Sequence, residues 1–191
     1  MEEYNLVIEK NGLRLTIKVY SIGEALGILE EVDGGFFRVT DEKGRVKALG
    51  YIAFPRDGQS PGRSALLVLL DQMFKGLGGL LAERIRCASL QVIEVNEDAQ
   101  EAAGTGGVSY LRVQTDDDIL GVLRRLQGKG MTVLFTGDKR LASRAKRETP
   151  GVRVQYMPPG KHNSRNEIVD EMALRIEALA SIQCRTVAQS K

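Results

Sequence analysis

The sequence predicts a three-layer α/β/α protein with a mostly parallel sheet and a small N-terminal ββαββ unit. Two hairpin patterns occupy the first part of the chain, and strand and helix patterns alternate in the second part. Alternation of this kind produces crossover connections and a parallel sheet with helices on both faces. We therefore divide the chain into a unit of residues 1–54, a linker of residues 55–63, a domain of residues 64–180 and a tail of residues 181–191.

The N-terminal unit is predicted from its turn and capping residues. Asn11-Gly12 favours a two-residue hairpin turn, because both residues adopt positive φ angles readily. Ser21 and Glu24 have the spacing of a capping box at the start of an apolar helix. Residues 41–44 predict the turn of a second hairpin. The expected strands are Tyr4–Glu9, Leu13–Val19, Phe36–Thr40 and Val46–Ala53.

The second part of the chain contains the alternating elements. Its expected strands are Leu90–Val95, Val108–Val113, Met131–Thr136 and Val152–Met157. Its expected helices are Asn96–Ala103, Asp116–Gln127, Lys139–Arg147 and a last helix that begins after Asn163 or Ser164 and ends near Ala180. Residues 64–86 fit either one helix or a strand, a turn and a helix. The glycines at 76, 78 and 79 favour the second interpretation, with a strand at Leu66–Leu70.

Composition excludes several classes of protein. The 191 residues are 42% hydrophobic and 27% charged, as expected for a globular protein with a buried core. No apolar run approaches the length of about 20 residues that a membrane-spanning helix needs, and no signal peptide is recognised. The two cysteines lack ligand spacing, which predicts unpaired thiols in a reducing cytoplasm. The single histidine excludes zinc sites that need two.

The net charge of +2 hides an uneven distribution of charge. Between residues 124 and 165 the chain carries eleven Lys and Arg residues against two acidic residues. Such an excess is typical of a solvated helical surface or of a binding surface for a polyanion. The second interpretation makes RNA a candidate partner.

Two acidic clusters are expected at the carboxyl ends of strands, where parallel α/β sheets bind their ligands. One is Thr115-Asp116-Asp117-Asp118, and the other is Thr136-Gly137-Asp138, with Gly137 allowing a sharp turn. Each cluster is explained by helix capping alone. Three adjacent aspartates nevertheless repel one another, and a divalent cation would relieve this repulsion.

Together these segments resemble the C-terminal half of PIN-domain nucleases. The resemblance covers residues 108–157 and is carried by Asp117-Asp118-Ile119-Leu120, by Val133-Leu134-Phe135-Thr136-Gly137-Asp138 and by Leu141 and Ala145. It implies a PIN-like fold and a ribonuclease that uses Mg²⁺ or Mn²⁺. Asp71, after the strand at Leu66–Leu70, takes the place of the aspartate that ends the first strand of that family.

The resemblance also implies roles for individual residues. The expected catalytic residues are Asp71, Asp117 and Asp138. The expected metal ligands are Asp71, Asp117, Asp118 and Asp138, with Asp116 as an alternative neighbour, and Glu97 or Glu101 as a further acid. The expected substrate-binding residues are Thr136, Lys139, Arg140, Arg144 and Arg125.

Two other functions fit the same residues. Thr136-Gly137-Asp138 with Lys161 resembles the core of haloacid-dehalogenase phosphatases, although Met73 stands where that family has a second aspartate. The aspartates also suit a metal-free module that binds nucleic acid or takes part in assembly. In either case the N-terminal unit offers a surface for formation of a homo-oligomer.

Overall fold

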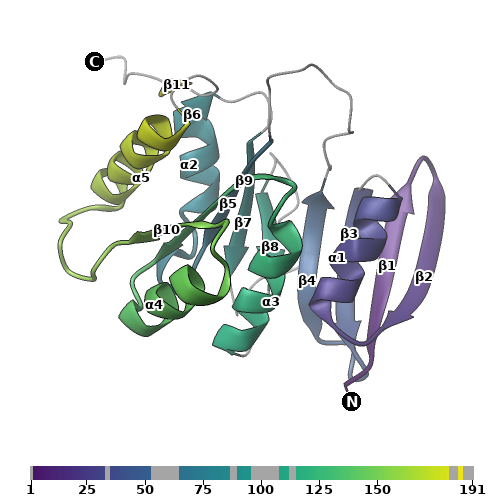
Figure 1. The fold of residues 1–191 in the computed structure, drawn as a ribbon. Coiled ribbons are helices and arrows are strands. Elements are labelled where there is room, and N and C mark those ends of the chain that lie inside the picture. The colour runs from purple at the N-terminus through teal and green to yellow at the C-terminus, as the bar shows by residue number, and fades with distance from the viewer. Residues whose placement is uncertain are drawn as a thin grey trace.

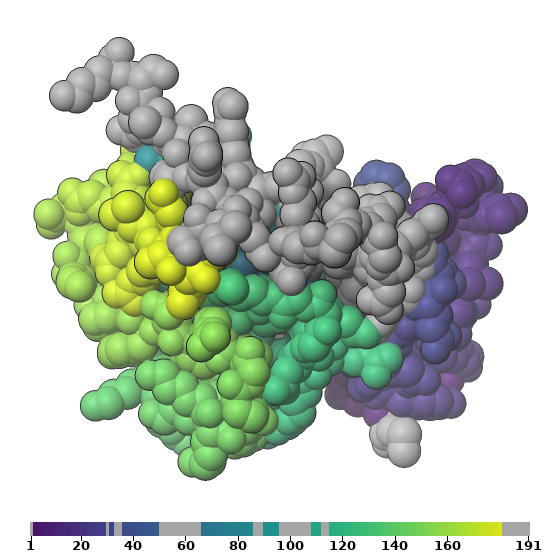
Figure 2. Space-filling model, turned by 45° about the horizontal axis from the view of Figure 1, so that its top comes forward, coloured from purple at the N-terminus to yellow at the C-terminus, as the bar shows by residue number. Residues whose placement is uncertain are grey.

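The structure, a computed structural model, is mixed α/β and describes residues 2–32, 35–52, 65–86, 90–95, 108–111, 115–180 and 185–186. Nine of the strands in these ranges form one sheet, in the order β10-β9-β5-β7-β8-β4-β3-β1-β2 (Figure 1). The parallel and antiparallel parts of the protein are therefore continuous. Figure 2 shows the N-terminal strands and the C-terminal helices at opposite ends of the molecule.

The antiparallel part follows the predicted hairpins. It consists of β1 (Tyr4–Lys10), β2 (Leu13–Val19), α1 (Ile22–Glu31), β3 (Gly35–Asp41) and β4 (Val46–Ile52). Asn11 and Gly12 have φ angles of 52° and 77°, as the hairpin turn requires. The Ser21 hydroxyl accepts a hydrogen bond from the Glu24 backbone N–H at 3.0 Å. The Glu24 carboxylate reaches back to the N–H of Tyr20 rather than to that of Ser21.

The parallel part contains β5 (Ala65–Leu70), β7 (Leu90–Val95), β8 (Val108–Leu111), β9 (Gly130–Thr136) and β10 (Arg153–Tyr156). Its helices are η1 (Gln72–Phe74), α2 (Gly78–Arg84), α3 (Asp116–Leu126), α4 (Lys139–Glu148) and α5 (Arg165–Leu179). The prediction of a strand, a turn and a helix after residue 64 is confirmed. Gly76, at the turn, has a φ of 79°. None of the described helices combines the length and apolarity needed to cross a membrane.

The parallel part of the sheet extends on both sides of β5. After β5 the chain adds β7 and then β8 on one side, and it returns to the other side of β5 to add β9 and β10. The strand order thus reverses between β5 and β9. At such a point the connections leave in opposite directions, which opens a crevice beyond the carboxyl ends of the two strands.

The N-terminal unit shares its core with the parallel part. β4 pairs antiparallel with β8, and α1 packs beside α3 (Figure 1). Buried side chains of α1, α3 and α4 form one continuous apolar cluster on one face of the sheet. Those of α2 and α5 form a second cluster on the opposite face. The chain division expected from the sequence therefore does not separate two independent cores.

Some sequence expectations fall outside the described residues. These are the linker of residues 55–63, the helix at Asn96–Ala103, Glu97, Glu101 and both cysteines. One pairing was missed: within the tail expected at 181–191, β11 (Arg185–Thr186) pairs antiparallel with β6 (Ile85–Arg86). Two-residue strands carry no periodic pattern, so the sequence offers no signal for them.

The shared core predicts cooperative unfolding. Leu29 of α1 is fully buried in the cluster that also contains α3. We expect Leu29→Ala to destabilise the whole chain by about 2–5 kcal/mol, because it leaves a cavity in this common core. Urea denaturation followed by far-ultraviolet circular dichroism and by tyrosine fluorescence should give one transition, shifted equally by both signals.

Leu13→Ala is the matched control, because Leu13 is 76% exposed at the end of the first hairpin. Its effect should stay within about 0.5 kcal/mol. Two separate transitions, of which Leu29→Ala shifts only one, would show instead that the N-terminal unit folds independently.

Candidate functional site

A chain of hydrogen bonds joins the backbone of Asp138 to the carboxylate of Asp71 where β5 and β9 end. The backbone N–H of Asp138 donates to the Thr136 hydroxyl oxygen at 3.0 Å. The Thr136 hydroxyl donates to Oδ2 of Asp71 at 2.7 Å. This arrangement lies at the reversal of strand order described above. The structure therefore brings together three of the residues that the sequence selected, from segments 65 positions apart.

The pairing of β5 with β9 positions these residues. The two strands are parallel neighbours, with Leu70 opposite Phe135. The N–H of Asp71 continues the ladder by donating to the Phe135 carbonyl at 3.0 Å. Asp71 then caps η1 by accepting from the Gln72 N–H at 2.7 Å. Asp138 caps α4, because its Oδ1 accepts from the N–H groups of Arg140 and Leu141.

The two carboxylates differ in burial but share a lack of cationic partners. Asp71 is only 8% exposed, whereas Asp138 is exposed. Within the described part of the chain neither carboxylate forms an ion pair. A buried carboxylate is costly unless hydrogen bonds or a cation compensate its charge. Carboxylate and hydroxyl oxygens are hard donors, which suit Mg²⁺ or Mn²⁺.

Gly137 serves a different purpose from the one expected. Its φ angle is not among the positive ones of the described glycines, so the turn does not require glycine. A Cβ atom at this position would instead overlap the thioether of Met73 and would lie 3.1 Å from the Met157 carbonyl oxygen. Glycine therefore lets the residues that follow β5 and β10 pack closely against position 137.

Glu94, at the carboxyl end of β7, is a third acidic residue at this edge that the sequence analysis did not select. It lies opposite Leu70 in the sheet and is completely buried. Its carboxylate accepts hydrogen bonds from the N–H of Gly76 and, at 3.0 Å, from the N–H of Gly78. Glu94 thus holds the loop that follows Asp71. A charged residue within the apolar run Leu90–Val95 was the available signal.

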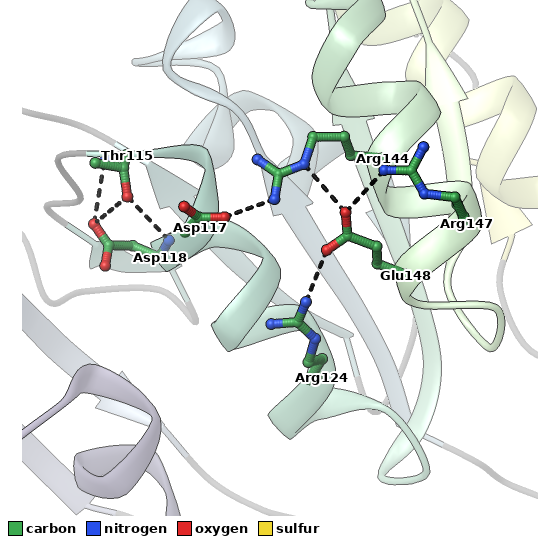
Figure 3. A network of polar contacts seen from close by, with 7 residues as sticks. All are labelled: Thr115, Asp117, Asp118, Arg124, Arg144, Arg147 and Glu148. Carbon is green, nitrogen blue, oxygen red and sulfur yellow. Dashed lines mark hydrogen bonds and ion pairs between the residues drawn. The ribbon is translucent and has the colours of Figure 1, made fainter.

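Asp117 and Asp118 take part in other interactions. Asp117 accepts a hydrogen bond from Arg144 of α4 at 2.6 Å. Asp118 completes a capping box with Thr115 at the start of α3. Figure 3 shows both carboxylates engaged in these contacts. The hydrogen bond from Arg144 and the charge of its guanidinium hold the pKa of Asp117 below its ordinary value of 3.8.

The expected cluster of Asp71, Asp117, Asp118 and Asp138 is not formed. Among the described residues no group of three or more His, Cys, Asp or Glu side chains is placed to hold a metal ion. The strand order explains this result. α3 follows β8, which lies two strands from β5 on the side away from β9, and neighbouring strands are about 4.8 Å apart.

The predicted substrate-binding cations also lie at different places in the structure. Lys139 and Arg140 follow Asp138 directly and are exposed in the first turn of α4. Arg144 is bound to Asp117 and Glu148. Arg125 lies near the other end of α3, in a groove against α1 that Gly27 and Glu31 also line. Only the first two therefore adjoin the site.

Lys161, which the haloacid-dehalogenase resemblance requires at the site, lies near α5 instead. Its ammonium is 3.9 Å from the carboxylate of Glu171, which also contacts His162 and Arg175. Burial raises the pKa of Glu171, but the hydrogen bonds from His162 and Arg175 outweigh burial, and the net shift is downward. Lys161 is thus associated with a carboxylate outside the Asp71–Asp138 site.

Comparison with known proteins finds no relative of this chain. No protein-family model matches the chain, and neither a curated protein nor a solved structure shows significant similarity to it.

The buried position of Glu94 predicts a stability effect. In Glu94→Gln, the amide nitrogen replaces an acceptor oxygen and faces a backbone N–H. We expect a loss of about 1–3 kcal/mol, the cost of leaving a buried polar group unsatisfied. Urea denaturation measures this loss as a decrease in the free energy of unfolding. Glu24→Gln at the exposed start of α1 is the control and should cost less. Equal effects would contradict the role assigned to Glu94.

The ion pair of Asp117 predicts a pH-dependent effect. Because the pKa of Asp117 is lower in the folded chain than in the unfolded chain, its ionised form stabilises the fold above the unfolded value near 3.8. This contribution disappears as the pH falls through the folded-state pKa. Thermal unfolding from about pH 7 to about pH 2 should therefore show Asp117→Asn less stable than the wild type at neutral pH and equal to it in acid.

Asp116→Asn is the matched control for this prediction. Asp116 also lies in the first turn of α3 but has no ion pair within the described residues. The Asp116→Asn variant therefore measures only the effect of removing one negative charge from the N-terminus of α3. The same pH dependence of stability in both variants would mean that the ion pair between Asp117 and Arg144 does not stabilise the fold.

Proposed function

We propose that this chain is a divalent-cation-dependent ribonuclease with a PIN-like, three-layer arrangement around its parallel strands. One observation carries the proposal: the hydrogen-bonded chain of Asp138, Thr136 and Asp71 at the reversal of strand order. Asp71 directly follows β5 and Asp138 follows β9, as the resemblance to PIN-domain nucleases implies. The proposed ligand set is thus narrower than the one expected from the sequence.

Asp71 and Asp138 would hold the cation, which supplies an activated water and neutralises negative charge on the phosphate. The Thr136 hydroxyl fixes the orientation of the Asp71 carboxylate. Oδ1 of Asp138 is committed to the N–H groups of α4, while Oδ2 accepts no hydrogen bond within the described residues. Asp138 therefore keeps one oxygen for a ligand while it caps the helix.

Lys139 and Arg140 support an anionic substrate. Two carboxylates by themselves repel a phosphodiester, and these two exposed cations begin the helix that Asp138 caps. The dipole of α4 adds partial positive charge at the N-terminus of this helix. Positive charge at the start of α4 thus offsets the negative charge of the substrate.

A catalytically inactive RNA-binding module is the second candidate. The engagement of Asp117 with Arg144 favours it, because this contact removes a carboxylate that the PIN-like resemblance places at the metal. RNA binding by the wild type without any cleavage in Mg²⁺ or Mn²⁺ would establish this module and overturn the nuclease.

The nuclease proposal predicts different effects for the three aspartates. With single-stranded and hairpin RNA in Mg²⁺ or Mn²⁺, we expect Asp71→Asn and Asp138→Asn to lower the cleavage rate at least about 100-fold, the scale for loss of one charge-stabilising group. Asp138→Asn retains a good helix cap, so its fold should persist. EDTA should abolish cleavage by the wild type.

Asp117→Asn is the matched variant, because Asp117 is the aspartate that the structure assigns to Arg144. Its cleavage rate should stay within about threefold of the wild type, as expected for a group outside the reacting centre. Cleavage that persists in EDTA, or that depends on Asp117 but not on Asp71, would contradict the proposal.

A further inference from the structure

The basic residues on α4 and its neighbour α3 divide into two sets. The first set surrounds Glu148 and Asp117 and comprises Arg124, Arg144 and Arg147, which we call the paired arginines. Glu148 accepts from all three, at 2.8, 3.2 and 3.1 Å, and Arg144 also reaches Asp117. Figure 3 shows this network between α3 and α4. The positive charge on this side of α4 is therefore largely compensated.

The second set comprises Lys139, Arg140, Ser143 and Lys146, which we call the outer strip. Lys139, Ser143 and Lys146 lie along the other side of α4, and Arg140 lies in its first turn. All four residues are exposed. None of their side chains has a hydrogen bond or ion pair within the described residues. Three uncompensated cations and a hydroxyl thus occur next to a compensated cluster on the same short helix.

The helical periodicity explains the division. Lys139, Ser143 and Lys146 are spaced i, i+4 and i+7, which places them on one side of α4. Arg144 and Glu148 are spaced i and i+4 on the side that meets α3. The apolar face between the two sides contains Leu141, Ala142 and Ala145, which are buried against the sheet. Lys139, Ser143 and Lys146 are therefore directed away from α3, whereas Arg140 lies one turn before Arg144.

The dimensions of the outer strip fit several phosphates. Seven residues of α-helix separate Lys139 from Lys146, or about 10 Å along the helix axis. One strand of a nucleic-acid duplex carries one charge per about 3.4 Å of axis, so this length corresponds to at most about three phosphates of a single strand. Lys, Arg and Ser side chains are common phosphate-binding groups, and they bind without regard to sequence.

The strip also begins at the candidate site. Lys139 and Arg140 follow Asp138, whose carboxylate caps the same helix. A strand with one phosphodiester beside Asp138 can therefore continue along the exposed cations of α4. The side toward α3 presents Glu148 and Asp117 instead, and hydrogen bonds from arginines lower the pKa of both carboxylates, so that both are ionised at neutral pH.

We infer that a single RNA strand extends from the Asp71–Asp138 site along the outer strip of α4, rather than over the paired arginines. The inference rests on the proposed function, because it assumes that the substrate enters beside Asp138. It adds a direction and a set of phosphate contacts that the site alone does not give.

Lys146→Gln and Arg147→Gln are the variants that test this path. They change adjacent exposed residues of α4, one in the strip and one among the paired arginines. Binding of fluorescent single-stranded RNA is measured by anisotropy in EDTA at several salt concentrations, with gels to verify intact RNA. We expect Lys146→Gln to weaken binding several-fold and to reduce the slope of log affinity against log salt by about 0.7, the value for one phosphate contact. Arg147→Gln should leave the slope unchanged.

Oligonucleotide length provides a second measurement. The affinity of the wild type should rise with length until the RNA covers the strip, and Lys146→Gln should reach its plateau at a shorter length. An equal loss in both variants, or a larger loss in Arg147→Gln, would overturn the path while leaving RNA cleavage intact. Strip-dependent binding with no cleavage in Mg²⁺ or Mn²⁺ would overturn the nuclease but support the strip. Absence of RNA binding would overturn both.

Discussion

The hydrogen bond from the Thr136 hydroxyl to the Asp71 carboxylate exists only because β5 and β9 are parallel neighbours. In that pairing Leu70 lies opposite Phe135, so the residues that follow the two strands emerge at one edge. The Asp138 N–H directs the Thr136 proton toward Asp71 by donating to the same hydroxyl oxygen. A slip of one residue in either strand would turn Asp71 or Thr136 to the opposite face, because side chains alternate along a strand.

The nine-stranded sheet has consequences beyond the site. The N-terminal hairpins look like an appendage in the sequence, because their turns and alternating residues are local and complete. In the structure β4 extends the sheet from β8, and α1 adds its apolar side chains to those of α3. A helix that is amphipathic in isolation thus becomes part of a larger core. The N-terminal unit contributes to the stability of the region that contains the site.

Acidic residues in this chain illustrate how one chemical group serves different purposes. Asp118 completes the capping box of α3 and Asp117 pairs with Arg144. Asp138 caps α4 while it retains an oxygen that accepts no hydrogen bond within the described residues. Glu94 binds backbone N–H groups inside the protein, one of them at the first residue of α2. Capping was predictable, because Thr115 and Asp138 stand directly before helical patterns. The role of Glu94 was not, because its partners lie 16 and 18 positions away.

The sequence by itself determined most of the local elements: the turn at Asn11-Gly12, the caps at Ser21, Thr115 and Asp138, and the buried strand Leu90–Val95. These features depend on backbone preferences and on contacts within a few residues. Only the tertiary structure decided that Asp71 meets Thr136, that Asp117 meets Arg144, and that both parts of the chain share one sheet. Each of these outcomes depends on strand order, which hydrophobic periodicity leaves undetermined because every buried parallel strand presents the same apolar pattern to its neighbours.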